Sequence, residues 1–267
     1  MTIKLVITDI DGTILNDQHH LDSGLKKAVK KLKEMDIPFI LASARAPSGM
    51  IELLKMLNIL DFPLVSFNGA LIGHWKIDQF YPLIEHPLAK KELKLILDFV
   101  TTQHPNLSIN LYTSNDWRVE TFDSWAQKEA EIVKTLPIIG KFPDLPAHKL
   151  LLIGDVNEIQ NTLLGLKTLG LTHTSFNLSK PNYLEITSCA CSKKTALEEI
   201  AKYYQLHPSE ILAFGDHYND LEMLKAAGCG IAMGNAPQPV KNEVDYITTS
   251  NNENGVSKAL TTYLFEK

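Results

Sequence analysis

The sequence predicts an α/β protein with a doubly wound parallel-sheet core, interrupted by an inserted α+β domain. Three observations support this fold class. Apolar runs alternate with amphipathic segments at the start of the chain, the pattern of a parallel sheet with crossover helices. From about residue 70, strand-like segments follow one another without alternating helices, which indicates an antiparallel sheet. The first pattern returns near residue 193.

The first part of the predicted core reads strand, helix, strand, helix, strand. Residues 5–7 form an apolar run typical of a strand buried on both faces. Residues 23–35 carry apolar side chains at helical spacing with lysines on the other face, and residues 48–57 are also helical. Buried-strand patterns fill residues 39–42 and 64–67. This alternation predicts neighbouring strands of one parallel sheet.

The inserted domain is expected over residues 84–186, between core segments 1–83 and 187–267. Strand patterns and amphipathic helices alternate irregularly there, and Asp155 with Glu158 resembles a capping box at the start of a helix. After the pattern changes near residue 70, the expected strands are 71–84 (a pair), 107–112, 118–122, 149–153 and 183–186. The expected helices in this part of the chain are 87–102, 125–135 and 155–169. For the returning core, the expected helices are 193–203, 221–227 and 256–265, and the expected strands are 211–214, 230–233 and 246–247.

Composition excludes several classes of function. The chain has 267 residues, 45% of them hydrophobic, enough for a substantial core. Its net charge of −5 gives no overall basic field for nucleic acid or an anionic membrane. It opens directly on a strand pattern and has no apolar run near the roughly 18 residues of a membrane span, so we expect a cytoplasmic protein, a monomer or a weak homodimer. The three cysteines are expected to be free and mostly buried.

The stretch Asp9-Ile10-Asp11-Gly12-Thr13 ends the first predicted strand with two carboxylates. Strand alternation sends Asp9 and Asp11 to the same side, and Gly12 permits a sharp turn after them. At about 4 Å and an effective dielectric constant of about 20, their repulsion is about 4 kcal/mol. Such a pair needs a cation between the carboxylates or a raised pKa on one of them. The alternative is a turn in which an Asp side chain caps the backbone.

Other predicted strands also end in polar residues, and a lysine opens a nearby helix. These residues are Ser43, Arg45, Asn68, Asp216, Asn219, Asp220 and Lys193. The carboxyl ends of parallel strands meet at one edge, so we expect these side chains to converge in one crevice. Oxygen ligands without His or Cys favour Mg²⁺, which usually keeps positions open for water and a phosphate oxygen. Lys193 and Ser43 could bind the remaining phosphate oxygens, so the sequence predicts a phosphoryl-transfer site.

All of these residues except Asn219 also have a purely structural interpretation. Asp216, Asp220 and Ser43 could cap helices, and Asn68 could stabilise its own turn. Lys193 could be a surface lysine. For Arg45, a contact with substrate or phosphate and a structural ion pair are equally open.

The ordered motifs resemble those of the haloacid dehalogenase superfamily phosphatases, specifically the Cof-type subgroup with a large α+β cap. The resemblance covers essentially the whole chain. Besides the first motif and the strand-end residues, it includes Asn68-Gly69-Ala70, Gly215-Asp216-His217-Tyr218-Asn219-Asp220, Met233-Gly234-Asn235-Ala236 and Asn254-Gly255-Val256.

The resemblance implies a role for each matched residue. Asp9 would be the nucleophile that forms an aspartyl-phosphate, and Asp11 would protonate the leaving oxygen and then activate water. Mg²⁺ would be held by an Asp9 oxygen, the Asp11 backbone carbonyl and Asp216, with Asp220 either as a further ligand or as support for the other ligands. The residues expected to bind phosphate or substrate are Ser43, Ala44, Arg45, Asn68, Lys193 and Asn219. Ala44 and Lys194 stand where the family commonly has Gly, which bears on substrate preference more than on activity.

The function expected from the sequence is Mg²⁺-dependent hydrolysis of a small phosphorylated metabolite, such as a sugar phosphate, a nucleotide or a phosphorylated cofactor. The inserted domain would close over the site and select the leaving group. Two alternatives are a phosphomutase of sugar phosphates and a non-catalytic regulator that binds phosphometabolites.

Overall fold

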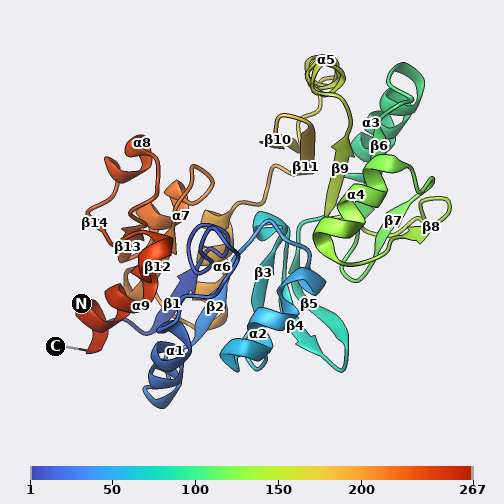
Figure 1. The fold of residues 1–267 in the computed structure, drawn as a ribbon. Helices are drawn as coiled ribbons and strands as arrows, with labels where there is room; N and C mark the ends of the chain where they lie inside the picture. Colours follow the sequence, from blue (N-terminus) through green and yellow to red (C-terminus); the bar gives the residue numbers. More distant parts are fainter. Residues whose placement is uncertain (1, 266–267) are drawn as a thin grey trace. The chain divides into compact units, whose positions relative to one another are not determined.

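The computed structural model describes residues 2–265, which divide into two compact units (Figure 1). The core unit contains the residues up to Leu83 and those from Ser192 onward, and the inserted unit is Ile84–Cys191. The boundary expected after residue 186 falls inside strand β11 (Tyr183–Ser188). No helix among residues 2–265 is long and apolar enough to cross a lipid bilayer.

The core unit is built on a five-stranded parallel sheet with the strand order β14-β13-β12-β1-β2. Its strands are β1 (Leu5–Thr8), β2 (Phe39–Leu41), β12 (Ile211–Gly215), β13 (Cys229–Ala232) and β14 (Tyr246–Ile247). The β1, β2 and β12 strands are wholly buried, as their apolar sequences predict. From β1 the chain moves outward to β2 and later returns on the other side at β12, so the strand order reverses between β1 and β12.

The third expected strand is present but joins a different sheet. Strand β3 (Leu64–Ser66) pairs antiparallel with β4 (Leu71–Lys76), and β5 (Gln79–Glu85) completes a three-stranded sheet. A single parallel bridge, between Ala42 and Val65, links β3 to the core sheet. The expectation of a third full strand in the parallel sheet was therefore wrong, because all three residues of β3 pair with the hairpin partner that follows at once and only one bridge to the core sheet remains.

Helices of the core unit connect these strands. They are α1 (Leu25–Glu34), α2 (Ile51–Leu57), α6 (Lys193–Tyr203), α7 (Leu221–Ala226), α8 (Gln238–Lys241) and α9 (Gly255–Leu260). Helix α1 packs beside α2 and α9, and α6 packs beside α7. The chain crosses from β1 to β2 and from β12 to β13 in opposite directions along the sheet. Because such crossovers between parallel strands are right-handed, their helices lie on opposite faces of the sheet. This is the doubly wound arrangement. The last helix is shorter than expected, because the chain continues beyond Leu260 as a π-helical turn.

The inserted unit contains a six-stranded sheet with the order β10-β11-β9-β6-β7-β8 (Figure 1). Besides β11, its strands are β6 (Ser108–Tyr112), β7 (Trp117–Val119), β8 (Ile138–Ile139), β9 (Lys149–Ile153) and β10 (Thr174–Lys180), and its helices are α3 (Lys90–Gln103), α4 (Ser124–Val133) and α5 (Val156–Lys167). The strands pair antiparallel except for β7 with β8. One apolar cluster includes Leu150, Leu152 and Ile186 from the strands and Ile96 and Ile159 from α3 and α5, so this unit has a core of its own.

Two local expectations were also wrong. Asp155 stands at the N-cap of α5, but its side chain makes no capping hydrogen bond, so the capping box is not formed. The three cysteines form no disulfide within residues 2–265, as expected, but only Cys229 is buried, whereas Cys189 is exposed and Cys191 half-buried.

Candidate active site

Two carboxylates flank the point at which the strand order of the core sheet reverses. Asp9 follows β1 directly and Asp216 follows β12 directly. Thr8 lies opposite Phe214 in the parallel register, so both strands end at the same edge of the sheet. In open α/β sheets a ligand binds at this edge, in the crevice at the reversal. Asp9 is only 6% exposed, so its carboxylate is largely shielded from water.

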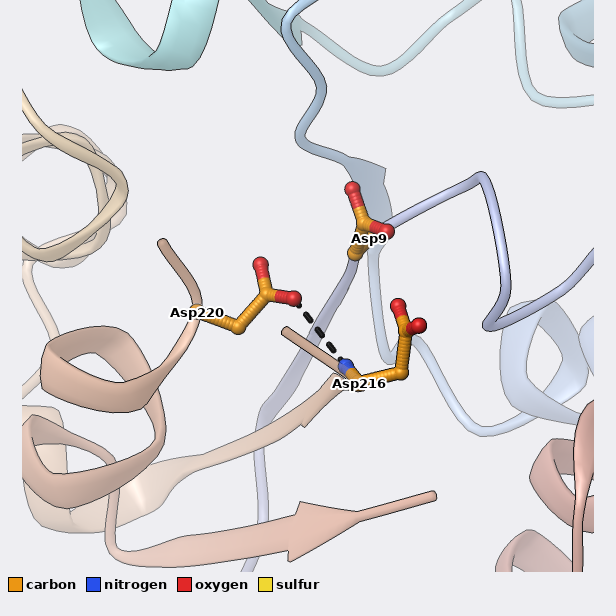
Figure 2. Close-up of side chains that lie close together, drawn as sticks. All are labelled: Asp9, Asp216 and Asp220. Atoms are coloured by element: carbon orange, nitrogen blue, oxygen red, sulfur yellow. Dashed lines mark hydrogen bonds between the residues drawn. The ribbon is translucent and has the colours of Figure 1, made fainter. Parts of the chain in front are cut away.

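Asp220 supplies a third carboxylate from the loop between β12 and α7. Its side chain is fully buried, and its Oδ2 accepts hydrogen bonds from the backbone N–H groups of Asp216 and His217, each at 3.0 Å. Figure 2 shows the side chains of Asp9, Asp216 and Asp220 around one small space. One oxygen of each lies within 4.8 Å of the others. Asp220 therefore orders its loop with one oxygen while the other remains available to the site.

Lys193 places a positive charge between two of these carboxylates. It is the first residue of α6, whose start is fixed by a capping box in which Ser192 accepts from the Thr195 N–H at 3.1 Å. Its Nζ donates to Asp9 Oδ1 and, at 2.6 Å, to Asp220 Oδ1. The side chain is 1% exposed, so Lys193 is not a surface lysine.

Burial shifts the pKa values of these groups. Burial raises the pKa of Asp9 to about 8, with Asp220 and Asp216 adding to the effect and Lys193 opposing it. Burial and the charge of Asp220 raise the pKa of Asp216 to about 6. Burial disfavours the ammonium form of Lys193, but Asp9 and Asp220 outweigh it and hold the Lys193 pKa above its usual range. The arrangement thus penalises negative charge on Asp9 and Asp216, and a bound cation would relieve that penalty.

The donor set fits a magnesium ion. When all four groups are ionised, three carboxylates and one ammonium leave a net charge of −2, which a divalent cation would neutralise. Mg²⁺ prefers oxygen ligands, and a site with one or two carboxylates leaves room for water and a phosphate oxygen. Asp9 Oδ2 and the carboxylate of Asp216 are not bonded to Lys193, so they are the groups best placed to hold the ion.

Asp11 is paired with Arg45. Arg45 Nε donates to Asp11 Oδ2 at 2.8 Å and Arg45 Nη2 donates to Oδ1 at 2.6 Å, a bidentate ion pair. The Asp11 side chain is 48% exposed and lies outside the group of three clustered carboxylates. Arg45 forms an ion pair in this structure, and a contact of Arg45 with substrate or phosphate stays a prediction. A metal contact through the Asp11 backbone carbonyl stays a prediction.

The other residues expected to bind phosphate or substrate lie in the segments that follow β2, β3 and β12. Ser43 is buried after β2, and its Oγ accepts from the Arg45 N–H at 3.3 Å. Ala44, half-buried, lies between them. Asn68 has a left-handed backbone with φ of 55°, and its Oδ1 accepts from Asn219 Nδ2 at 3.3 Å. The structure therefore joins the motif after β3 to the loop after β12.

Sequence reasoning gave no role to Thr13. Its Oγ donates to Asp216 Oδ1 at 3.0 Å and lies 3.5 Å from Asp9 Oδ2. Its position in the first motif was visible in the sequence, because a hydroxyl two residues after Asp11 can return towards the strand end once Gly12 turns the chain. Gly12 does so with a φ of +78°.

Comparison with known proteins agrees with this fold. Residues 6–260 match the family model described as haloacid dehalogenase-like hydrolase. A Haemophilus influenzae protein named as a proposed phosphatase is 33% identical over 264 residues, covering 97% of this chain and 98% of that protein. The 5-amino-6-(5-phospho-D-ribitylamino)uracil phosphatase YcsE of Bacillus subtilis is 29% identical over 267 residues, covering 97% and 94%. A crystal structure of a haloacid dehalogenase-like hydrolase from Bacteroides thetaiotaomicron superposes with a TM-score of 0.86 at 30% identity, covering 98% and 99%.

The chain belongs to the haloacid dehalogenase-like hydrolases. It is a phosphatase that acts on small phosphorylated substrates, which sets aside the non-catalytic alternative.

Proposed function

We propose that this protein is a Mg²⁺-dependent phosphatase that hydrolyses small phosphate monoesters through a phosphoryl group carried on Asp9. The cluster of Asp9, Asp220 and Lys193, all buried, with the half-buried Asp216 is the observation that carries the proposal. Two buried carboxylates and a third, half-buried one beside a buried ammonium are costly to a fold. Their placement at the strand-order reversal supports a catalytic reason for keeping them.

In the first step, an Asp9 carboxylate oxygen attacks phosphorus and the bond from phosphorus to the ester oxygen breaks. Asp11 donates a proton to that departing oxygen, which leaves as an alcohol. Lys193 and Ser43 hold the nonbridging phosphate oxygens, so the charge of the phosphate does not repel the nucleophile. Asp9 and Asp216 would hold Mg²⁺, which would supply further neutralisation of that charge.

In the second step, Asp11 takes a proton from a water molecule as the water attacks the phosphorus of the aspartyl-phosphate. The bond between phosphorus and the Asp9 oxygen breaks, which releases inorganic phosphate and restores the carboxylate. Arg45 holds both Asp11 oxygens in this structure, so Asp11 must exchange one of those hydrogen bonds for the leaving oxygen or the water. Arg45 is therefore expected to orient the acid between turnovers.

The inserted unit is proposed to be the cap that selects the leaving group. It has its own sheet and apolar core, so it can change without disturbing the residues that handle phosphate. The substrate is proposed to be a sugar phosphate, a nucleotide or a phosphorylated cofactor. The name of the Bacillus subtilis relative supports the inclusion of phosphorylated ribityl compounds among candidates.

The test is phosphate release from a panel of phosphorylated metabolites by the wild type and by Asp9→Asn, with Mg²⁺ and with a chelator. The raised pKa shows that a neutral group is favoured at position 9, so the amide should fold normally. We expect at least about a 10³-fold loss of turnover, because no carboxylate remains to attack phosphorus. Asp98→Asn, an exposed change on α3, serves as the matched control and should retain full activity. Near wild-type activity in Asp9→Asn would contradict the nucleophile assignment.

A further inference from the structure

The side chain of Asn235 joins three segments that meet at the acidic cluster. Its Nδ2 donates to the Gly12 carbonyl oxygen at 2.9 Å and to Asp216 Oδ2 at 3.3 Å. Its Oδ1 accepts from the backbone N–H of Asn251 at 3.0 Å. Asn235 thus connects the turn after β1, the end of β12 and the loop before α9.

The orientation of this amide is fixed by its backbone partners. The Asn251 N–H can only donate, so it must face the amide oxygen, and the Gly12 carbonyl can only accept, so it must face the amide nitrogen. The group that Asn235 presents to Asp216 is therefore a donor. Asp216 receives this donor on Oδ2 and the Thr13 hydroxyl on Oδ1 at 3.0 Å.

A carboxylate oxygen has two lone pairs, so each Asp216 oxygen keeps one acceptor position after these contacts. The two donors fix the plane of the carboxylate without using up its capacity to bind a cation. The packing is close on the same side, because a Cβ at Gly12 would lie only 2.4 Å from Asp216 Oδ2. The Asp216 carboxylate is thus held in one orientation against the turn that follows Asp11.

We propose that Asn235 is a positioning residue that sets the affinity of the acidic cluster for a divalent cation by orienting Asp216. This inference rests on the proposed function, in which Asp216 is a ligand of Mg²⁺. Hydrogen bonds to a ligating carboxylate lower the cost of ordering it, and their loss typically weakens metal binding by about 10- to 100-fold. Asn235 acts through Asp216 and has no part in the transfer of the phosphoryl group itself.

Asn252, in the loop before α9, provides a matched control. Asn251 Nδ2 donates to the Leu15 carbonyl at 3.1 Å and to Asp17 Oδ1 at 3.0 Å, while Asn252 Nδ2 donates to Asp17 Oδ2 at 2.9 Å. Both tie the loop before α9 to the segment after Thr13. Asn252, unlike Asn235, has no hydrogen bond to Asp216 among residues 2–265. Asn252→Ala therefore removes an amide from the same network without touching the Asp216 carboxylate.

The experiment is calorimetric titration of Mg²⁺ into the wild-type protein and into Asn235→Ala, Asn235→Leu and Asn252→Ala. Asn235→Leu keeps the size of the side chain, so it remains informative if the alanine variant folds poorly. We expect both Asn235 variants to bind Mg²⁺ about 10- to 100-fold more weakly and Asn252→Ala to stay within about twofold of the wild type. A purely structural role would instead lower the melting temperature of the metal-free protein and leave Mg²⁺ affinity unchanged.

The outcomes separate this inference from the proposed function. If wild type binds Mg²⁺ and the Asn235 variants bind it equally well, the positioning role is overturned while the phosphatase mechanism stands. Equal weakening in the Asn235 variants and in Asn252→Ala would also overturn it, because the effect would belong to the loop as a whole. Absence of Mg²⁺ binding in the wild type would overturn both. A raised half-saturating Mg²⁺ concentration in Asn235→Ala, with an unchanged substrate KM at saturating Mg²⁺, would support the inference independently.

Discussion

At the scale of single residues, the ion pair between Arg45 and Asp11 is a contact expected to matter for catalysis while it contributes little to the free energy of unfolding. Its two side chains are 31% and 48% exposed. A pair in such contact with water contributes only about 0.2–1 kcal/mol to the free energy of unfolding. The geometry is nevertheless bidentate, which fixes the direction of the Asp11 carboxylate more firmly than a single hydrogen bond would.

We therefore expect Arg45→Met to fold with a free energy of unfolding within about 1 kcal/mol of the wild type. Its kcat should fall by about 10- to 100-fold, because an unguided Asp11 delivers its proton less often, and general acid–base catalysis contributes about 10²–10⁴ in rate. Urea denaturation and steady-state kinetics measure the two quantities. A rise in KM with unchanged kcat would show instead that Arg45 binds substrate, the other role considered for this residue.

The sequence could predict which residues gather at the site but not how they pair. The convergence of Asp9, Asp216 and Asp220 was predictable because the carboxyl ends of parallel strands meet at one edge. The bidentate pairing of Arg45 with Asp11 depends on side-chain torsions and on a contact between residues 34 positions apart in the chain. No periodicity or local motif encodes that pairing.

At the scale of elements, the first turn of α6 is the part of the fold on which the site most depends. Lys193 is its first residue, and the Ser192 and Thr195 side chains close a capping box around the turn. The N-terminus of a helix leaves backbone N–H groups without partners, and a capping side chain satisfies one of them. The capping box thus fixes the point from which the Lys193 side chain extends towards Asp9 and Asp220.

Ser192→Ala should lower the free energy of unfolding by about 1 kcal/mol, because the Thr195 N–H loses its acceptor. Asp155→Ala is the matched control, since Asp155 holds the same N-cap position on α5 but makes no capping hydrogen bond. It should cost less than Ser192→Ala when both are measured by chemical denaturation. Equal losses in the two variants would show that the capping box does not stabilise α6.

The two strands of the inserted sheet that the sequence failed to predict share a physical cause. Strands β8 and β10 lie at the two edges of the inserted sheet, and most of their residues are exposed. Edge strands form through backbone pairing with a neighbour, so their side chains need no buried apolar pattern. The fully buried strands β1, β9 and β12 carry that pattern and were predicted correctly.

At the scale of the whole molecule, the two units differ in what a bound cation can stabilise. The proposed ligands Asp9, Asp216 and Asp220 all belong to the core unit, whereas the inserted unit has a separate apolar cluster. A ligand stabilises the structure that binds it, by about 2.7 kcal/mol when its free concentration is 100 times Kd. That stabilisation should fall on the unit that contains the ligands.

We therefore expect Mg²⁺ to slow amide hydrogen exchange in β1 and β12 but not in β9 and β11. At a Mg²⁺ concentration 100 times Kd, amides of β1 and β12 that exchange through unfolding of the core unit should slow by about 100-fold relative to chelator, because binding must be undone before they open. Mass spectrometry of exchanged peptides measures all four strands in one sample. Asp9→Asn should reduce the Mg²⁺ effect in β1 and β12, since one ligand has lost its charge. Equal slowing in β9 and β11 would contradict the expectation, because the cation would then stabilise the inserted unit as strongly as the unit that contains its proposed ligands.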